Sequence, residues 1–538
     1  MGMRGADLVA RSLASAGVRT VFALSGNQIM PIFDACIDAD IRLIHTRHEA
    51  ATVYMADAWA QITGEVGVAL ITAAPGFANG LSPLFSAKAA ESPVVLLSGD
   101  SPVSQDGMGA FQELAQAEIA APLTKTAFRA KTADGLGYDV AKAIRVARSG
   151  RPGPVHLALP FDILNADLPE SAVPATDAFA VEKALPDGVA VEALAEALAG
   201  AARPLVLTGP ALNRSRSGDL LDTLADAVDA PVVAMESPRG LNDPSLGAFS
   251  EVLPDADLIV GLGKAIDFTL GFARPPAVNP DAPIHLVDAE PDMLDRARRL
   301  LGARLAAALC ADPREVAANL VARTPVGQTA RGAWRKTVVS AIGHRDTGLS
   351  ATAGKIPSWT LCEAVQEVLD AADDPVLISD GGEFGQWAQA FVAAPTRVIN
   401  GPSGAIGGGL CYAIAAKLAR PEATVVAMMG DGTAGFHFSE FDTAVRAGAG
   451  IVAVIGNDAR WNAEHLIQMR DYGPQRLIGC DLNRTRYDLA AAGLGCHGEH
   501  VTAAEELAPA FERSLSAGKP ACVNVEIEGF GAPNFARR

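Results

Sequence analysis

The sequence predicts an α/β protein made of three doubly wound, parallel-sheet domains, and two observations carry that prediction. The chain has 538 residues, which is too long for one hydrophobic core and suggests about three domains. Short apolar runs alternate with amphipathic helical segments along most of the chain, and the runs end at Gly, Ser, Asn or Asp. This alternation is typical of parallel strands joined by helices.

The first domain is expected over residues 1–165. Its amphipathic helices are predicted at 6–16 and 50–63. Its strands are predicted at 20–24, 42–45, 66–72 and 93–98, and within 150–160. The following stretch, 165–188, is predicted to be a linker, because its prolines interrupt regular elements.

The second domain is expected over residues 190–322, with strands at 204–208, 231–235, 258–260 and 284–287. Gly261 and Gly263 follow one strand as in dinucleotide-binding folds, but Ile266 stands where the third glycine of that pattern belongs. Asp288 ends a later strand, where an acid that binds ribose could sit. We favour a tight turn in a structural domain, and a nucleotide site stays open. The polar stretch 324–359 is predicted to be a second linker.

The third domain, expected over residues 360–530, carries the strongest motif. A predicted strand at 424–429 breaks at Gly430-Asp431-Gly432, and a strand at 451–455 ends at Gly456-Asn457-Asp458. A helix is predicted between them from about residue 439. In a parallel sheet both strand ends open onto one edge, where ligands of such folds bind. Asp431 and Asp458 can therefore converge on one hard cation.

The glycines of this motif indicate a phosphate ligand. Glycine lets the backbone approach a diphosphate closely, and Thr433 adds an N–H and a hydroxyl at a helix start. The arrangement matches the thiamine diphosphate motif, in which Gly-Asp-Gly, a helix and a strand precede an Asn-Asn pair. Here Asn457-Asp458 replaces that pair, so an amide ligand becomes a carboxylate, which still suits Mg²⁺. The alternative is a strand, turn and helix in which the glycines only turn the chain.

The bulk composition excludes several classes of partner. The formal charge of −18 argues against nucleic acid or an anionic membrane as a main partner. The apolar runs are short and interrupted, so no transmembrane helix is expected. The start of the chain shows no signal-peptide pattern, and the seven scattered cysteines are typical of free thiols in a reducing compartment. These features predict a cytoplasmic enzyme.

Glu49 is the leading candidate for a catalytic group. A thiazolium coenzyme needs a carboxylic acid beside its aminopyrimidine ring to relay a proton, and burial suits that acid because it raises the pKa. Glu49 follows a predicted strand, opens a helix and precedes the apolar run Ala50-Ala51. The alternative is a first-turn glutamate that the helix dipole favours. The motif of the third domain favours the catalytic interpretation.

The chain resembles thiamine-diphosphate enzymes of the acetolactate synthase-like family over essentially its whole length. The similar segments, in chain order, are 47–51, 74–76, 79–80, 110–113, 150–154, 380–387 and 404–410. The resemblance implies a pyrimidine-binding first domain, a central Rossmann-like domain and a third domain that binds diphosphate and Mg²⁺. It also implies a homodimer at minimum and a homotetramer as the expected assembly, since Glu49 of one subunit would meet the third domain of another.

The resemblance also implies individual contacts to thiamine diphosphate and its metal. Mg²⁺ would be held by Asp431, the side chain of Asp458 and the carbonyl of Arg460. The coenzyme would be bound by Glu383, Phe384, Gly404, Ile406, Gly430, Gly432, Thr433, Asp458, Trp461 and Asn462. Glu383-Phe384 departs from the Gln-His that the family usually has at the phosphate contacts. Ile406 would lie under the bend of the coenzyme, and it fits a core position equally well.

The implied substrate site is less specific than the coenzyme site. Its residues would be Ser25, Gly26, Asn27, Phe111, Gln112, Trp387 and His465. Asn27 stands where acetolactate synthases generally carry glycine, so a polar group would reach toward the substrate. His437 and His465 could act as acid or base, or could simply be polar loop or helix residues. Residues 442–482 resemble benzaldehyde lyase more closely, and 261–272 resemble the nucleotide-binding domain of oxalyl-CoA decarboxylases and 2-hydroxyacyl-CoA lyases, which leaves an FAD or ADP site open.

Three hypotheses for the function follow from these patterns. The first is decarboxylation of a 2-oxo acid and ligation of the product to an acceptor, as acetolactate synthases do. The second is a lyase or carboligase that acts on 2-hydroxy ketones, aldehydes or 2-hydroxyacyl-CoA. The third is a non-catalytic cofactor-binding subunit. A Rossmann dehydrogenase is disfavoured, because the glycine pattern is broken at Ile266.

Overall fold

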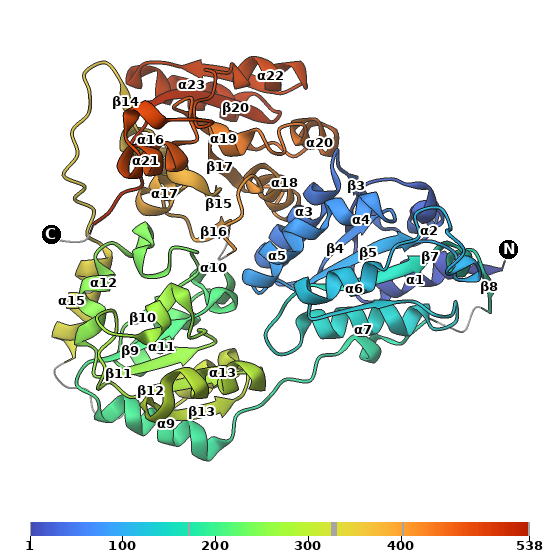
Figure 1. The fold of residues 1–538 in the computed structure, drawn as a ribbon, viewed down its shortest axis with the longest axis horizontal. Coiled ribbons are helices and arrows are strands. Elements are labelled where there is room, and N and C mark those ends of the chain that lie inside the picture. The colour runs from blue at the N-terminus through green and yellow to red at the C-terminus, as the bar shows by residue number, and fades with distance from the viewer. Residues whose placement is uncertain (1, 170–172, 324–330, 401–402, 536–538) are drawn as a thin grey trace.

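Three parallel β-sheets confirm the predicted fold class. The structure, a computed structural model, describes residues 2–169, 173–323, 331–400 and 403–535 (Figure 1). The first sheet has the strand order β3-β2-β4-β5-β7-β6, the central sheet β10-β9-β11-β12-β13, and the third β14-β20-β18-β17-β15-β16, with β19 paired to β20. A small additional sheet pairs β1 (Met3–Arg4) antiparallel to β8 (Asp167–Leu168).

The first sheet is covered by helices on both faces. Its strands are β2 (Thr20–Ala23), β3 (Arg42–His45), β4 (Gly67–Ile71), β5 (Val94–Asp100), β6 (Thr126–Arg129) and β7 (Val155–Pro160). Its helices are α1 (Gly5–Ser15), α2 (Met30–Asp38), α3 (Glu49–Thr63), α4 (Pro75–Asn79), α5 (Leu81–Ala89), α6 (Gln116–Ala120), α7 (Leu136–Arg148) and α8 (Phe161–Leu164). The buried strands are almost continuously apolar, as a sheet covered on both faces requires.

The central sheet is built in the same way. Its strands are β9 (Pro204–Thr208), β10 (Val232–Ala234), β11 (Leu258–Leu262), β12 (Ile284–Asp288) and β13 (Leu305–Cys310). Its helices are α9 (Gly188–Gly200), α10 (Arg214–Ser217), α11 (Leu220–Ala227), α12 (Phe249–Val252), α13 (Pro291–Leu301), α14 (Pro313–Val321) and α15 (Gly332–Ile342).

The helix α15 corrects one sequence prediction. Residues 332–342 were expected within a linker, but they form a helix because an apolar stripe packs against the central sheet. Trp334 and Val338 are buried there, and Trp334 Nε1 donates a hydrogen bond to the carbonyl of Pro204 at 2.8 Å. The start of the predicted linker, residues 324–330, lies outside the described part of the chain.

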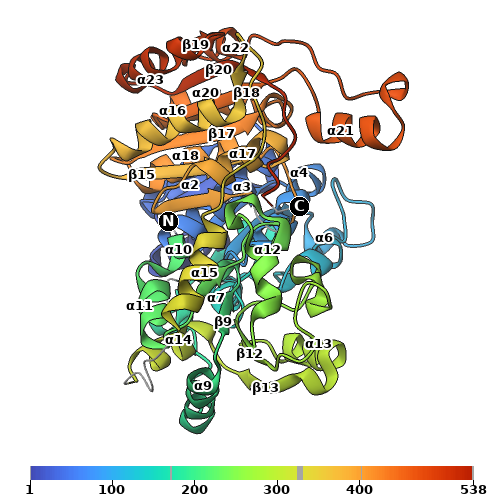
Figure 2. The same ribbon diagram turned by 90° about the vertical axis from the view of Figure 1, so that its left-hand side faces the viewer.

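The third sheet carries the motif that the sequence singles out. Its strands are β14 (Ile356–Pro357), β15 (Pro375–Ser379), β16 (Thr396–Ile399), β17 (Thr424–Gly430), β18 (Val452–Asn457), β19 (His497–Val501) and β20 (Ala521–Glu528). Its helices are α16 (Ser358–Asp370), α17 (Gly382–Phe391), α18 (Gly409–Ala419), α19 (Asp431–Ala434), α20 (Glu440–Ala447), α21 (Asn462–Asp471), α22 (Tyr487–Gly493) and α23 (Leu507–Ser516). Figure 2 shows α21 and the loop after it projecting from the body of this domain.

The first and third domains share one apolar core. Helices α3 and α18 pack together, and the core cluster includes residues of both (Figure 1). Within it the hydroxyl of Tyr412 donates to Asp57 Oδ2 at 2.7 Å, and both side chains are buried. This packing fixes where Glu49, the first residue of α3, lies relative to the third domain. Among the described helices none is both long and apolar enough to cross a membrane.

Candidate active site

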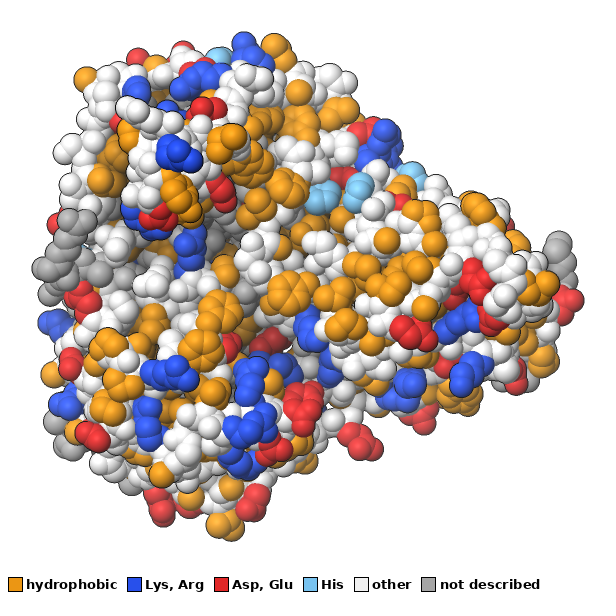
Figure 3. Space-filling view, viewed as in Figure 1, with side chains coloured by type: hydrophobic (Ala, Val, Ile, Leu, Met, Phe, Trp, Pro, Cys, Tyr) orange, Lys and Arg blue, Asp and Glu red, His pale blue; other side chains and the backbone are white. Residues whose placement is uncertain are grey.

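A cleft of about 330 Å³ lies at the carboxyl ends of the third sheet. Its walls come from the ends of the four strands β15, β16, β17 and β18, from the start of α21, and from residues 237–239 of the central domain. Figure 3 shows the surface hollowed between these two domains. This is the edge at which the ligands of open parallel sheets bind.

The two predicted metal-binding acids lie side by side at this edge. Strands β17 and β18 pair in parallel with Gly430 opposite Gly456, so the residues that follow them enter the cleft together. Asp431 is buried and Asp458 is half-buried. Burial raises the pKa of both carboxyl groups, and each lies within the electrostatic reach of the other. A divalent cation between them would offset the cost of placing two carboxylates so close together.

Several buried acceptors point to a ligand in this cleft. Asp431 Oδ2 is buried and has no hydrogen-bond partner among the described residues, and the carboxylate of Asp458 lies beside the Asp431 carboxyl group. The side-chain oxygens of Gln389, Asn400 and Asn462 line the same cleft and are also buried without a donor among the described residues. Buried acceptors are normally satisfied, so four of them around one cleft indicate that a bound group completes the site.

The apolar walls of the cleft depend on glycine. A Cβ at Gly432 would lie 2.7 Å from the Trp461 ring, and one at Gly456 would lie 2.7 Å from the Phe384 ring. A Cβ at Gly381 would lie 2.6 Å from Ile406 Cγ2. These glycines therefore let the side chains of Phe384, Ile406 and Trp461 lie directly on the backbone of the cleft floor. Ile406 lines the cleft and is only half-buried, so it is not a core residue here.

Glu383 is held by the C-terminal segment of the chain. Its Oε2 accepts a hydrogen bond from the N–H of Ala532 at 2.7 Å, and burial raises its pKa. Asn462 Nδ2 donates to the carbonyl of Phe530 at 2.9 Å, so the same segment also reaches α21. Residues 529–535 therefore cross one side of the cleft.

All the residues predicted to bind the coenzyme and the metal line this one cleft. They are Glu383, Phe384, Gly404, Ile406, Gly430, Asp431, Gly432, Thr433, Asp458, Arg460, Trp461 and Asn462. These residues are spread along the sequence of the third domain, and the fold brings them together around one cleft. Their roles toward a ligand stay predictions.

Glu49 lies in a different place, together with the residues predicted from the first domain. Asn79 Nδ2 donates a hydrogen bond to Glu49 Oε2 at 3.0 Å, and a Cβ at Gly76 would come within 3.3 Å of Glu49 Oε1. Glu49 is half-buried and is not among the described residues that line the cleft of Asp431. Within one chain, Glu49 and the cleft of Asp431 therefore form two separate parts of the predicted site.

The predicted substrate residues of the first domain surround the end of β2. Ser25 and Asn27 are exposed, and Gly26 lies against Thr72, with an added Cβ only 2.3 Å from that side chain. Gln112 has a φ of 59°, a left-handed conformation that is unusual away from glycine and often found at functional sites. Its Oε1 accepts a hydrogen bond from Gln28 Nε2 at 2.5 Å, and Phe111 beside it is 76% exposed.

The two substrate residues predicted from the third domain do not line the cleft. Trp387 is fully buried on the face of α17 that packs against Trp359, and its Nε1 donates to the carbonyl of Gly531 at 3.0 Å. The expected contact with substrate is therefore wrong for Trp387, because its indole belongs to the core. His465 is absent from the described lining of the cleft, and its Nδ1 lies 3.8 Å from Cys480 Sγ instead.

Sequence reasoning missed the contribution of the central domain to the cleft. Ser237 and Arg239 line it from the loop after β10, and Arg239 is exposed. A second cleft of about 180 Å³ shares Arg239 and Gln386 with the first. The signal was a Pro-Arg-Gly turn at the carboxyl end of a predicted strand, where binding residues gather in such sheets.

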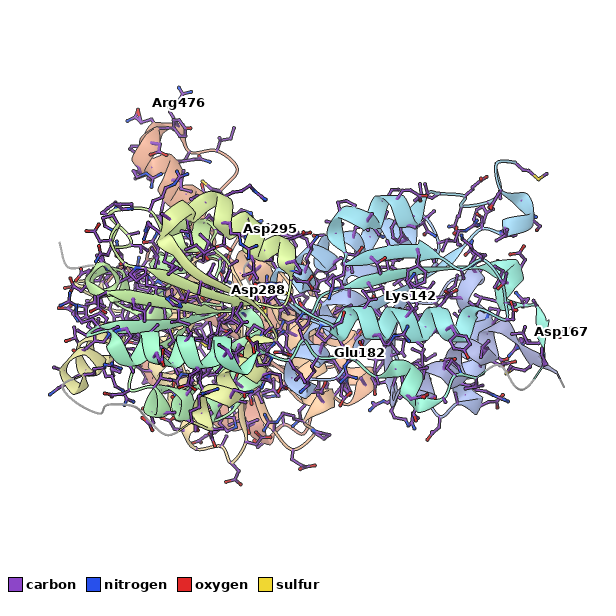
Figure 4. All side chains as sticks on the ribbon, turned by 90° about the horizontal axis from the view of Figure 1, so that it is seen from below. Lys142, Asp167, Glu182, Asp288, Asp295 and Arg476 are labelled. Atoms are coloured by element: carbon purple, nitrogen blue, oxygen red, sulfur yellow. The ribbon has the colours of Figure 1, made fainter. Side chains whose placement is uncertain are left out.

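A further cavity of about 320 Å³ lies between the first and central domains. Asp288, the predicted ribose-binding acid, lies there at the end of β12 (Figure 4). Its carboxylate pairs with the guanidinium of Arg151, which also pairs with Glu91 and donates to the carbonyl of Gly263 at 3.0 Å. Asp288 is thus already neutralised by a residue of the first domain.

Comparison with known proteins assigns the family. The thiamine pyrophosphate enzyme family matches the chain in three parts: its N-terminal TPP binding domain over residues 3–119, its central domain over 191–320, and its C-terminal TPP binding domain over 380–525. The chain belongs to the thiamine pyrophosphate enzyme family. The C-terminal TPP binding domain contains the cleft of Asp431, and the N-terminal one contains Glu49.

Individual relatives of this thiamine pyrophosphate enzyme fall into two groups. The acetolactate synthase large subunit of Mycobacterium tuberculosis is 32% identical over 97% of this chain and 95% of its own length. The 2-hydroxyacyl-CoA lyase 2 of Mus musculus is 32% identical over 92% of this chain and 84% of its own length, and that of Homo sapiens is 30% identical over 97% of this chain. The chain is therefore an acetolactate synthase-like, thiamine diphosphate-dependent enzyme, and the likeness to both groups matches the first two hypotheses.

Proposed function

We propose that this enzyme uses thiamine diphosphate and Mg²⁺ to make or break a carbon–carbon bond next to a carbonyl group, with decarboxylation of a 2-oxo acid as the first candidate reaction. The observation that carries the proposal is the set of four buried acceptors around the cleft of Asp431 that have no donor among the described residues. The relatives named acetolactate synthase support the 2-oxo acid as substrate. When bound, thiamine diphosphate supplies the carbon nucleophile and the electron sink.

Asp431, Asp458 and the carbonyl of Arg460 would hold Mg²⁺ together with the diphosphate. The two carboxylates give the oxygen-only ligand set that this cation prefers. Asp458 in place of the usual asparagine adds one negative charge, which Mg²⁺ must offset before the diphosphate can bind. Thr433, whose hydroxyl donates to the carbonyl of Gly430 at 3.1 Å, would present its N–H to the phosphates at the start of α19.

Glu49 would hold and deliver the proton that activates the coenzyme. The amide of Asn79 orients the Glu49 carboxylate, and a second subunit would bury it against the cleft of Asp431. The separation of these two halves within one chain supports a homodimer as the minimum active unit, with a homotetramer as the expected assembly. Closure by a partner would also exclude water from Glu49, so that the acid exchanges its proton with the coenzyme rather than with solvent.

Arg239 would bind the anionic group of the substrate. It lines both the coenzyme cleft and the second cleft, and it brings positive charge there from the central domain. A carboxylate of a 2-oxo acid fits a guanidinium in this position. Asn27 and Gln112 would face the substrate from the first domain of the partner.

A lyase that acts on 2-hydroxyacyl-CoA or on 2-hydroxy ketones is the second candidate. The second cleft, which shares Arg239 and Gln386 with the coenzyme cleft, favours it, because a long acyl-CoA needs room beyond the reacting carbon. The relatives named 2-hydroxyacyl-CoA lyase 2 support the same candidate function. An aldehyde would then be a product or an acceptor.

The FAD or ADP site in the central domain stays a separate prediction. The cavity beside Asp288 has room for a nucleotide, and Arg148 and Arg314 line it with positive charge. Arg151 forms an ion pair with the carboxylate of Asp288, so a ribose would have to displace Arg151 from that carboxylate. Titration with ADP and with FAD tests the prediction directly. We also expect the protein to be cytoplasmic.

Product analysis tests the proposed function. The enzyme is loaded with thiamine diphosphate and Mg²⁺ and offered pyruvate, benzoin or a 2-hydroxyacyl-CoA in separate reactions. Release of CO₂ with acetolactate from pyruvate supports the first candidate. Cleavage of benzoin or the acyl-CoA with pyruvate untouched supports the second candidate. Inertness toward all three by enzyme that binds the coenzyme would contradict both.

A further inference from the structure

A second group of potential metal ligands lies outside the coenzyme cleft. His465 on α21 faces two residues of the loop that returns from that helix, Cys480 and Asp481. His465 Nδ1 lies 3.8 Å from Cys480 Sγ and 4.0 Å from Asp481 Oδ1, and the three ligand atoms all lie within 4.8 Å of one another. We propose that these three side chains bind a transition-metal ion of the zinc class, at a site distinct from the Mg²⁺ site.

The spacing of the three atoms suits such an ion. A point equidistant from them lies at most about 2.5 Å from each, close to the usual zinc–ligand distances of about 2.0–2.3 Å. Only small side-chain movements are then needed to close the site. Three protein ligands leave the fourth tetrahedral position to water, and the exposed side of the site, where Asp481 is 75% exposed, gives the ion a path of entry.

The ligand types select the metal. A thiolate and an imidazole favour Zn²⁺ or Co²⁺, whereas Mg²⁺ prefers the carboxylate and carbonyl oxygens of the coenzyme cleft. Binding would release the thiol proton of Cys480 to solvent, because the thiolate is the ligand. Cys480 is 1% exposed, and its Sγ lies 3.8 Å from His465 Nδ1 and 4.0 Å from Gln468 Oε1.

The segment that carries the site has little apolar core of its own, and hydrogen bonds such as those between Gln468 and Ile478 join α21 to the returning loop. Among the residues of α21 only Asn462 is buried. Figure 2 shows α21 and its loop projecting from the domain, and Figure 4 shows Arg476 of that loop at the outer tip. A segment with so small an apolar core gains most from a cross-link, and a metal ion would join α21 to the returning loop.

The same cross-link would reach the wall of the coenzyme cleft. The N–H of Trp461 donates to the carbonyl of Cys480 at 2.8 Å, and that of Leu482 donates to the carbonyl of Ala459 at 2.8 Å. Fixing Cys480 therefore also fixes the backbone beside Trp461, whose ring lies on Gly432. The bound ion would thus cross-link residues 459–482, and His465 would bind this ion rather than the substrate.

Titration with Co²⁺ as a spectroscopic probe tests the proposal. The full chain, with Mg²⁺ and thiamine diphosphate present and its thiols reduced, should bind one Co²⁺ per chain and show a thiolate-to-cobalt charge-transfer band. Cys480→Ser should abolish the band, and His465→Gln or the exposed change Asp481→Asn should weaken Co²⁺ binding at least about tenfold. Cys310→Ser is the matched control, because Cys310 is an exposed cysteine far from this group in sequence, and it should leave the band unchanged.

Two results would overturn the proposal. One is the absence of a charge-transfer band in the wild-type chain, and the other is a band that persists in Cys480→Ser. Limited proteolysis gives a second readout that does not depend on the reaction: Zn²⁺ should slow cleavage within residues 473–482 in the wild type and not in Asp481→Asn. Equal protection of both proteins would show that the ion does not cross-link this segment. Because neither readout uses turnover, failure here is distinct from failure of the proposed function.

Discussion

The side-chain amide of Asn79 donates a hydrogen bond to the carboxylate of Glu49, with 3.0 Å between Nδ2 and Oε2. The donor comes from the end of α4 and the acceptor from the first turn of α3, so contact between two helices fixes the direction of the acid. This contact gives Glu49 a defined direction before any coenzyme is present.

Asn79→Ala should therefore lower turnover without abolishing coenzyme binding. Loss of a hydrogen bond to a charged group costs about 1.5–3 kcal/mol, which corresponds to roughly a tenfold to hundredfold decrease in kcat. Steady-state kinetics at saturating coenzyme would measure it. An unchanged kcat would show that the amide does not orient Glu49 during the reaction.

Two substitutions at Asp458 should distinguish the effect of its negative charge from the effect of its oxygen ligand on coenzyme binding. Asp458→Ala removes an oxygen ligand and should weaken thiamine diphosphate binding at least about tenfold, with the loss partly recovered at high Mg²⁺. Asp458→Asn keeps an oxygen ligand and removes the added charge, so it should bind the coenzyme within a few-fold of the wild type. Coenzyme titrations at several Mg²⁺ concentrations measure both. Identical affinity in Asp458→Ala would contradict the assignment of this ligand.

Arg239→Ala should discriminate between anionic and neutral substrates. Removing a guanidinium from a carboxylate should raise KM for an anionic substrate roughly tenfold to hundredfold, since a charge-assisted hydrogen bond is lost. A neutral substrate such as benzoin should be affected little, and Arg239→Lys should recover part of the loss. An equal effect on both kinds of substrate would mean that Arg239 only supports the fold.

The buried His156 should make the folded state sensitive to acid. Its ring nitrogen lies 2.8 Å from Ser98 Oγ, and burial lowers its pKa from 6.5 to about 3. The unfolded chain binds a proton at higher pH than the folded one, so the stability from this group is lost as pH falls from 6.5 toward 3, by up to about 1.4 kcal/mol per pH unit.

His156→Gln keeps a hydrogen-bonding side chain beside Ser98 and removes the titrating group. The fall of Tm between pH 6.5 and pH 4 should therefore be shallower in this variant than in the wild type. Parallel pH profiles of the two proteins would refute the assignment of that sensitivity to His156.

Much of the fold could be predicted from the sequence because the strands are buried on both faces. The strands that begin at Thr20, Arg42, Pro204 and Ile284 begin where the apolar runs predict. The convergence of Asp431 and Asp458 also followed from parallel topology, since adjacent parallel strands must open at the same edge. These inferences needed only local pattern and connectivity.

The remaining features depend on tertiary packing, which the local pattern does not reveal. Trp387 could face either side of its helix, and the aromatic cluster with Trp359 decides that it is buried. Arg239 approaches the cleft only because the central domain packs against the third. His465 turns toward Cys480, a residue that no motif of the sequence linked to it.

Proton exchange at C2 of enzyme-bound thiamine diphosphate tests the central claim most directly. The exchange rate is measured in deuterated solvent for the wild type and for Glu49→Gln, each saturated with coenzyme and Mg²⁺. We predict that the variant retains the coenzyme with affinity within a few-fold of the wild type and exchanges at least about a hundredfold more slowly. Exchange at the wild-type rate in Glu49→Gln would contradict the role of Glu49 and, with it, this account of the site.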